Sequence, residues 1–123
     1  MPQPDPFDPL DFLKLAQDLA NTGGEERLRT AVGRAYYSLF LLARERTGAY
    51  PVKKADSAHT LVINAVRKRK GFAVGNDLYR LKQFRITADY HLLPADVALQ
   101  DWVQNWATAQ ALVQRLLPEL QAL

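Results

Sequence analysis

The sequence predicts an all-α domain, an up-and-down bundle of about five helices. Apolar residues recur at the three- and four-residue spacing of a helix, and no stretch alternates as a half-buried strand does. The predicted helices are joined by short connections, which favour an antiparallel arrangement of consecutive helices. A chain of 123 residues fits a single domain, residues 1–123, with a core of its own. Its polar, proline-rich start leads us to expect that residues 1–7 are flexible.

The first two helices are predicted from their apolar spacing and their ends. Asp8 suits the N-cap of the first helix, with Pro9 at its first position, and glycines at positions 23 and 24 stop it. The second segment, about Glu25 to Thr47, is apolar on nearly every side, which is typical of a central, buried helix. Gly48 ends it at the position that glycine favours.

Three further helices are predicted after polar residues that suit the N-cap position. They are about Ala58 to Lys70 after Asp56 or Ser57, a fourth after Asn76 or Asp77, and a fifth from about Asp96 to Leu117. Pro94 disfavours helical geometry at Leu93 and so ends the fourth helix.

Composition indicates a soluble, cytoplasmic protein. The chain has no cysteine, which fits a reducing compartment and excludes disulfides, thiolate metal sites and thiol nucleophiles. We expect no signal peptide, because the start lacks a basic and an apolar region. No apolar run approaches the ~20 residues that span a bilayer.

Positive charge is concentrated in one third of the sequence. Residues 51–91 carry nine Lys or Arg against three Asp or Glu, whereas the flanking thirds are slightly acidic. Such a region is expected where a protein meets a polyanion. A solvated basic face is the competing interpretation, and the run at 67–70 also complements a helix C-terminus.

Most familiar catalytic sites are absent from the sequence. There is no phosphate-binding glycine loop of the P-loop kind, and no Gly-x-Ser-x-Gly elbow. The only histidines, His59 and His91, form no metal-binding pair, so we expect neither a metal site nor a cofactor. For His59 we expect a capping or surface role.

Arg85 stands out because it lies within the apolar stripe of its own predicted helix. Arginine is seldom buried without a partner, and Asp89, four residues later, shares that face. Two interpretations stay open: a structural Arg85–Asp89 ion pair, or an arginine held in a cleft to bind phosphate. His91 would be rotated about 120° from Arg85 on a regular helix, so the two converge only if the helix loosens or a second subunit contributes.

Arg34 raises the same possibility in the second helix. It is adjacent on the helix to Tyr37, and tyrosines such as Tyr36 and Tyr37 are expected to be buried with paired hydroxyls. The functional interpretation is that Arg34 and Tyr37 line the same cleft as Arg85.

Two segments together resemble the HEPN superfamily of small helical proteins. Residues 34–40, RAYYSLF, resemble the R-x-Y-Y segment of its central helix. Residues 78–90, LYRLKQFRITADY, resemble the L-x-x-L-x-x-x-R-x-x-A-D-Y segment of a bacterial and archaeal subgroup. The order and separation of the two segments also agree, and the resemblance covers about residues 8–120.

The resemblance implies a dimeric helical bundle that acts as a metal-independent ribonuclease. Its motif is an arginine, four to six residues and a histidine, which Arg85 and His91 satisfy with five between them. The commoner spacing of four would place Tyr90 in the histidine's position. Many members are toxins encoded beside a small nucleotidyltransferase antitoxin, and others are non-catalytic partners.

Two functional hypotheses follow. The first is an endoribonuclease toxin in which Arg85 holds the scissile phosphate, His91 transfers protons and Asp89 orients Arg85, with RNA and a second copy as partners. The second is a non-catalytic module that binds RNA or a nucleotide or docks on a nucleotidyltransferase. Arg85 and Asp89 would then be structural, and Tyr90 would be available for binding or modification.

Overall fold

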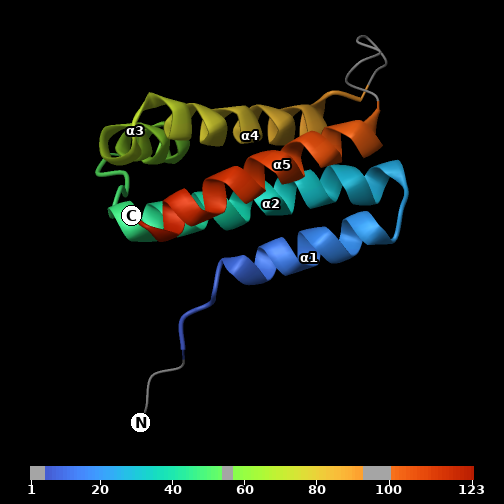
Figure 1. The fold of residues 1–123 in the computed structure, drawn as a ribbon, viewed down its shortest axis with the longest axis horizontal. Helices are drawn as coiled ribbons and strands as arrows, with labels where there is room; N and C mark the ends of the chain where they lie inside the picture. The colour runs from blue at the N-terminus through green and yellow to red at the C-terminus, as the bar shows by residue number, and fades with distance from the viewer. Residues whose placement is uncertain (1–4, 54–56, 93–100) are drawn as a thin grey trace.

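The computed structural model describes residues 5–53, 57–92 and 101–123. These ranges contain five helices and no strand: α1 (Leu10–Asn21), α2 (Glu25–Thr47), α3 (Ala58–Lys70), α4 (Phe72–Tyr90) and α5 (Trp102–Gln121). The predicted all-α bundle of five helices is therefore confirmed. In Figure 1, α2 separates α1 on one side from α4 on the other, α5 crosses beside it, and the short α3 lies against one end of α4.

Helix α2 is the centre of the bundle. It packs against each of the other four helices, and eleven of its residues are buried. Tyr36 and Leu39 are among the largest side chains with no exposed surface. Gly48, with φ of 67°, takes the left-handed conformation that ends the helix, as predicted. Although α2 is apolar on most sides, no helix of the described ranges is long and apolar enough to cross a membrane.

The start of α3 follows the predicted cap, whereas α1 begins at Leu10, with Pro9 and not Asp8 at the N-cap position. The carboxylate of Asp8 accepts a hydrogen bond from the backbone N–H of Leu10 at 3.0 Å. Ser57 accepts one from the backbone N–H of Thr60 at 3.2 Å, whereas Asp56 lies outside the described residues. Of the N-terminal segment expected to be flexible, residues 1–4 are likewise outside, and Phe7 packs on Phe12 with ring centroids 4.9 Å apart.

The predicted start of the fourth helix is wrong. Helix α4 begins at Phe72, because Gly71, with φ of 97°, turns the chain directly from α3 into α4. A single glycine suffices for this turn, since positive φ costs it little. Asp77 therefore lies inside α4, where both its carboxylate oxygens bind Arg115 of α5, at 2.8 and 2.7 Å.

The predicted end of the fifth helix, at about Leu117, also needs correction. Its described part begins at Trp102, after the Asp101 carboxylate accepts a hydrogen bond from the backbone N–H of Gln104 at 3.0 Å. It continues to Gln121 through Pro118, whose missing N–H removes only one bond near the helix end. The expected start at Asp96, and the stop at Leu93 and Pro94, lie outside the described residues.

Two helical glycines should respond oppositely to alanine. A Cβ at Gly33 would lie 3.8 Å from Cγ of Arg85, an ordinary contact, so Gly33→Ala should raise the free energy of unfolding by about 0.5–1 kcal/mol through helix propensity. A Cβ at Gly75 would overlap the Arg67 side chain and lie 3.2 Å from its Cα. Gly75→Ala should therefore lower that free energy by about 1–2 kcal/mol. Urea unfolding measures both, and shifts of the same sign would contradict this account of the helix contacts.

Candidate functional site

Arg85 lies on the side of α4 that faces α2, and only 11% of its side chain is exposed. Its guanidinium carbon is 5.7 Å from the ring centre of Tyr36 and 5.5 Å from that of Tyr37, which is cation–π range. Nη1 lies 3.5 Å from Oδ2 of Asp89. The predicted shielding of Arg85 and its pairing with Asp89 are both present.

The environment of Arg85 leaves part of its guanidinium unsatisfied. Nε is buried and has no hydrogen-bond partner among the described residues. The Asp89 side chain, which pairs with Nη1, is 46% exposed to solvent. The arginine is thus fixed by aromatic rings on one side and by an accessible anion on the other.

Tyr37 connects Arg85 with Arg34. The guanidinium of Arg34 lies 5.4 Å from the Tyr37 ring centre and 5.2 Å from that of Phe12 in α1. The Tyr37 ring is therefore within cation–π range of both arginines, one from its own helix and one from α4. Arg34 and Arg85 are thus brought together by contacts to this one ring, whereas a cleft lined by the three residues stays a prediction.

His59 is placed differently from the prediction of a capping or surface role. Its ring stacks on Phe40 with centroids 4.4 Å apart, and its Nδ1 is 2.6 Å from the hydroxyl of Tyr36. This bond satisfies a tyrosine hydroxyl that is otherwise buried. Burial raises the pKa of Tyr36, so the hydroxyl stays protonated and can donate to a neutral imidazole.

His91 is the first residue after α4 and is exposed to solvent. Its backbone is extended, with φ of −92° and ψ of 91°, and its N–H bonds to the carbonyl of Thr87 at 3.1 Å. Within the described ranges, its side chain makes no hydrogen bond or ion pair. Tyr90, the last residue of the helix, is exposed beside it. One chain therefore does not bring the Arg85 and His91 side chains into contact.

Arg29 of α2 holds the end of α4, a role that the sequence did not suggest. Its Nη1 donates to the backbone carbonyls of Ala88 at 3.0 Å and His91 at 2.9 Å. Its guanidinium also stacks on Trp102 of α5 at 4.6 Å from the ring centre. A cation at carbonyls that lack helical partners stabilises a helix C-terminus. The only sequence signal would have been an arginine beside the apolar stripe of a buried helix.

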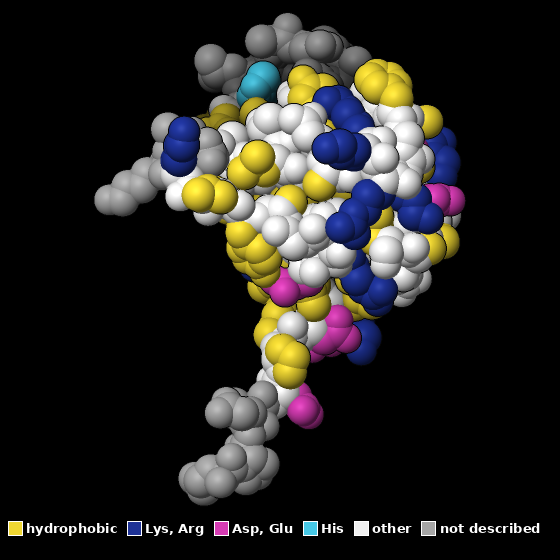
Figure 2. Space-filling view, turned by 90° about the vertical axis from the view of Figure 1, so that its left-hand side faces the viewer, with side chains coloured by type: hydrophobic (Ala, Val, Ile, Leu, Met, Phe, Trp, Pro, Cys, Tyr) yellow, Lys and Arg dark blue, Asp and Glu magenta, His cyan; other side chains and the backbone are white. Residues whose placement is uncertain are grey.

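The basic third of the chain has partly structural roles. Arg69 donates to the carbonyls of Arg46 and Thr47 at the end of α2, at 3.1 and 3.4 Å. Lys70 lies 3.6 Å from the carboxylate of Glu119. Figure 2 shows Lys and Arg side chains gathered on the end of the molecule that includes α3. Because backbone carbonyls are neutral, Arg69 keeps its positive charge uncompensated by them, whereas Lys70 is paired with Glu119.

Comparison with known proteins identifies no relative. No family model matches the sequence, and no curated protein or solved structure matches the chain. The HEPN resemblance therefore stays an expectation that depends on the two segments quoted above. In the described ranges, no three His, Asp or Glu side chains are close enough together to bind a metal ion.

Protonation of His59 should destabilise the fold. Its pKa is lowered, mainly because burial disfavours the imidazolium and further because Lys82 and Arg85 repel it. The contribution to stability is thus complete above the unfolded pKa of about 6.5 and decreases as pH falls below it. Urea titrations should show this decrease in the wild type and a smaller one in His59→Gln. His91→Gln, the control at an exposed histidine, should follow the wild type; the reverse order would contradict the assignment.

Removing the Arg29 guanidinium should loosen the end of α4. Arg29→Met should lower the free energy of unfolding by roughly 1.5–3 kcal/mol, because charged hydrogen bonds to the helix end are lost. Hydrogen exchange of the amides of residues 88–91 should become faster. Arg27→Met is a matched control two residues away, since Arg27 is exposed and contacts only Thr22 at 3.4 Å among the described residues. Equal effects of the two variants would show that the carbonyl bonds matter little.

Proposed function

We propose that the protein is a metal-independent endoribonuclease of the HEPN kind and the toxin of a pair with a small nucleotidyltransferase. The observation that carries this proposal is the shielded Arg85 guanidinium, fixed between Tyr36, Tyr37 and the exposed carboxylate of Asp89. A preorganised arginine that an anion can reach from one side suits the charge of a phosphodiester. The basic surface of Figure 2 supports attraction of a polyanion.

In the proposed reaction, RNA supplies its own nucleophile. The 2′-oxygen bonds to phosphorus as the bond from phosphorus to the 5′-oxygen breaks, which leaves a cyclic phosphate and a 5′-hydroxyl. His91 takes the proton of the 2′-hydroxyl and returns a proton to the leaving oxygen. Arg85 neutralises the charge on the phosphate oxygens. His91 is exposed to solvent, and histidine is the side chain that most often transfers protons as a general acid or base.

A second copy of the chain completes the proposed site. Arg85 and His91 make no contact in one chain, so catalysis needs His91 or Arg85 from a partner chain that meets this end of α4. Tyr90 and Leu92 are exposed apolar side chains on either side of His91, and they could be covered in such a homodimer. Light scattering that finds a monomer at high micromolar concentration would contradict the composite site.

The alternative is a non-catalytic module that binds RNA or a nucleotide, or partners a nucleotidyltransferase. One observation favours it: Arg85 and Asp89 already pair within the chain at 3.5 Å, as a structural pair would. Arg85 would then stabilise the packing of α4 on α2, and Tyr90 would be the accessible group. Cleavage assays distinguish the two proposals.

Purified protein should cleave mixed RNA in the presence of EDTA. His91→Ala should reduce the rate by about 10²–10⁴-fold, as loss of a general acid–base does, while costing well under ~1 kcal/mol of stability at its exposed position. Arg85→Ala should also abolish cleavage, and it should cost roughly 1–3 kcal/mol of stability, mainly through lost packing on Tyr36 and Tyr37, because the exposed Asp89 carboxylate stays hydrated. The double variant Arg85→Leu with Asp89→Asn limits that loss and gives a folded, inactive protein.

Circular dichroism checks the helical fold of every variant before the rates are compared. Equal cleavage by the wild type and His91→Ala would remove the proton-transfer role. Absence of cleavage of every RNA offered to the wild type would favour the non-catalytic module.

A further inference from the structure

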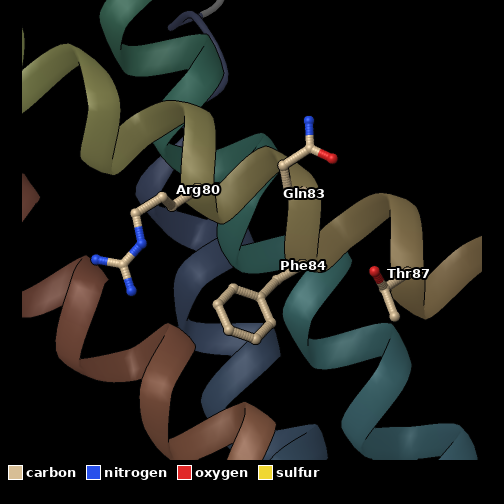
Figure 3. Close-up of a pocket in the computed structure, with 4 residues that line it drawn as sticks. All are labelled: Arg80, Gln83, Phe84 and Thr87. Atoms are coloured by element: carbon tan, nitrogen blue, oxygen red, sulfur yellow. The ribbon is translucent and has the colours of Figure 1, made fainter. Parts of the chain in front are cut away.

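A second feature of α4 lies on the side that faces α5. A pocket of about 260 Å³ is lined by Arg80, Gln83, Phe84 and Thr87, whose spacing places them along one face of the helix. In Figure 3, Arg80 and Phe84 extend from α4 towards α5, whereas Gln83 points away from α5. Arg85 belongs to another face, the one against α2. The pocket is therefore distinct from the Arg85 site.

Arg80 is a surplus cation beside this pocket. Both oxygens of Asp77 are bound by Arg115, at 2.8 and 2.7 Å, whereas Nη1 of Arg80 is 3.9 Å from the nearer oxygen. Two guanidinium groups thus share one carboxylate, and Arg115 holds it far more closely. The Arg80 side chain is 48% exposed and can move to meet another anion. One carboxylate faces two guanidinium groups, so the net positive charge at Arg80 favours binding of an anionic ligand.

The other lining residues suit a flat, polar ring. Phe84 presents a partly buried aromatic side chain, and within the described ranges Gln83 and Thr87 have no hydrogen bond from their side chains. Aromatic rings stack on nucleobases, and amide and hydroxyl groups bond to base edges. The volume is just below the ~300 Å³ at which pockets for whole drug-sized ligands begin, so it fits one base.

We propose that this pocket is a nucleotide subsite for single-stranded RNA. The base stacks on Phe84, Thr87 bonds to its edge, and Arg80 binds the adjoining phosphate. Thr87 precedes His91 by four residues, about 6 Å along the helix. The bound nucleotide therefore neighbours the phosphate that is cleaved, a placement that rests on the proposed function. The pocket makes the protein selective for the base beside the cut.

Binding of an uncleavable strand tests the subsite without catalysis. The probe is a fluorescent 2′-O-methyl pentanucleotide, whose blocked 2′-oxygen cannot attack, with affinity measured by anisotropy at low salt. Arg80→Gln and Phe84→Leu should each weaken binding roughly tenfold. Lys14→Gln is the matched charge control, because Lys14 is 78% exposed on α1, across α2 from α4 (Figure 1), and should change the affinity less than about twofold.

A second binding experiment removes one base from the pentanucleotide. An abasic residue at one position of the pentanucleotide should weaken wild-type binding roughly tenfold, and Phe84→Leu should add less than about twofold to that loss, because the same stacking contact is already gone. Thermal unfolding confirms that Phe84→Leu is folded at the assay temperature.

The outcomes separate the two proposals. Equal losses in Arg80→Gln and Lys14→Gln, or wild-type affinity that is indifferent to the abasic position, would overturn the subsite even if RNA is cleaved. Selective binding without any RNA cleavage would instead support the subsite and contradict the proposed catalysis.

Discussion

The central position of α2 is the constraint on which the rest of the structure depends. Because α2 is covered by the other helices, its large polar side chains form their contacts inside the bundle. Tyr36 bonds to His59, and the two tyrosines of α2 provide the surface on which Arg85 lies. Arg29 reaches out to the end of α4. The same contacts that make α2 compatible with burial therefore fix α4 and the candidate site.

Much of the fold could be predicted because its cues are local. Apolar periodicity and glycine stops located α2, and Ser57 marked the start of α3. The start of α4 was missed because a single glycine, Gly71, makes the turn and leaves no polar segment to mark it. Asp77 looked like a cap from its neighbours in sequence, but its partner, Arg115, is far along the chain.

In the candidate site too, contacts within one helix could be predicted from the sequence and contacts between helices could not. The pairing of Arg85 with Asp89 was predictable, because residues four apart on one helix share a face. The contacts of Arg29 and His59 join different helices, and no spacing rule within one helix specifies them. Sequence periodicity shows which face a residue occupies on its own helix. It does not show which residue of another helix lies opposite.

The Arg85–Asp89 pair has a consequence for selectivity. Because Asp89 already pairs with Nη1 of Arg85, an anion that binds there displaces a carboxylate rather than entering an empty site. Asp89 stays tethered beside Arg85 after its ion pair is broken, so a bound phosphodiester adds a second negative charge that the first one repels. Charge alone then gives the incoming anion no advantage. Discrimination at Arg85 must come from shape and from contacts made elsewhere along the ligand.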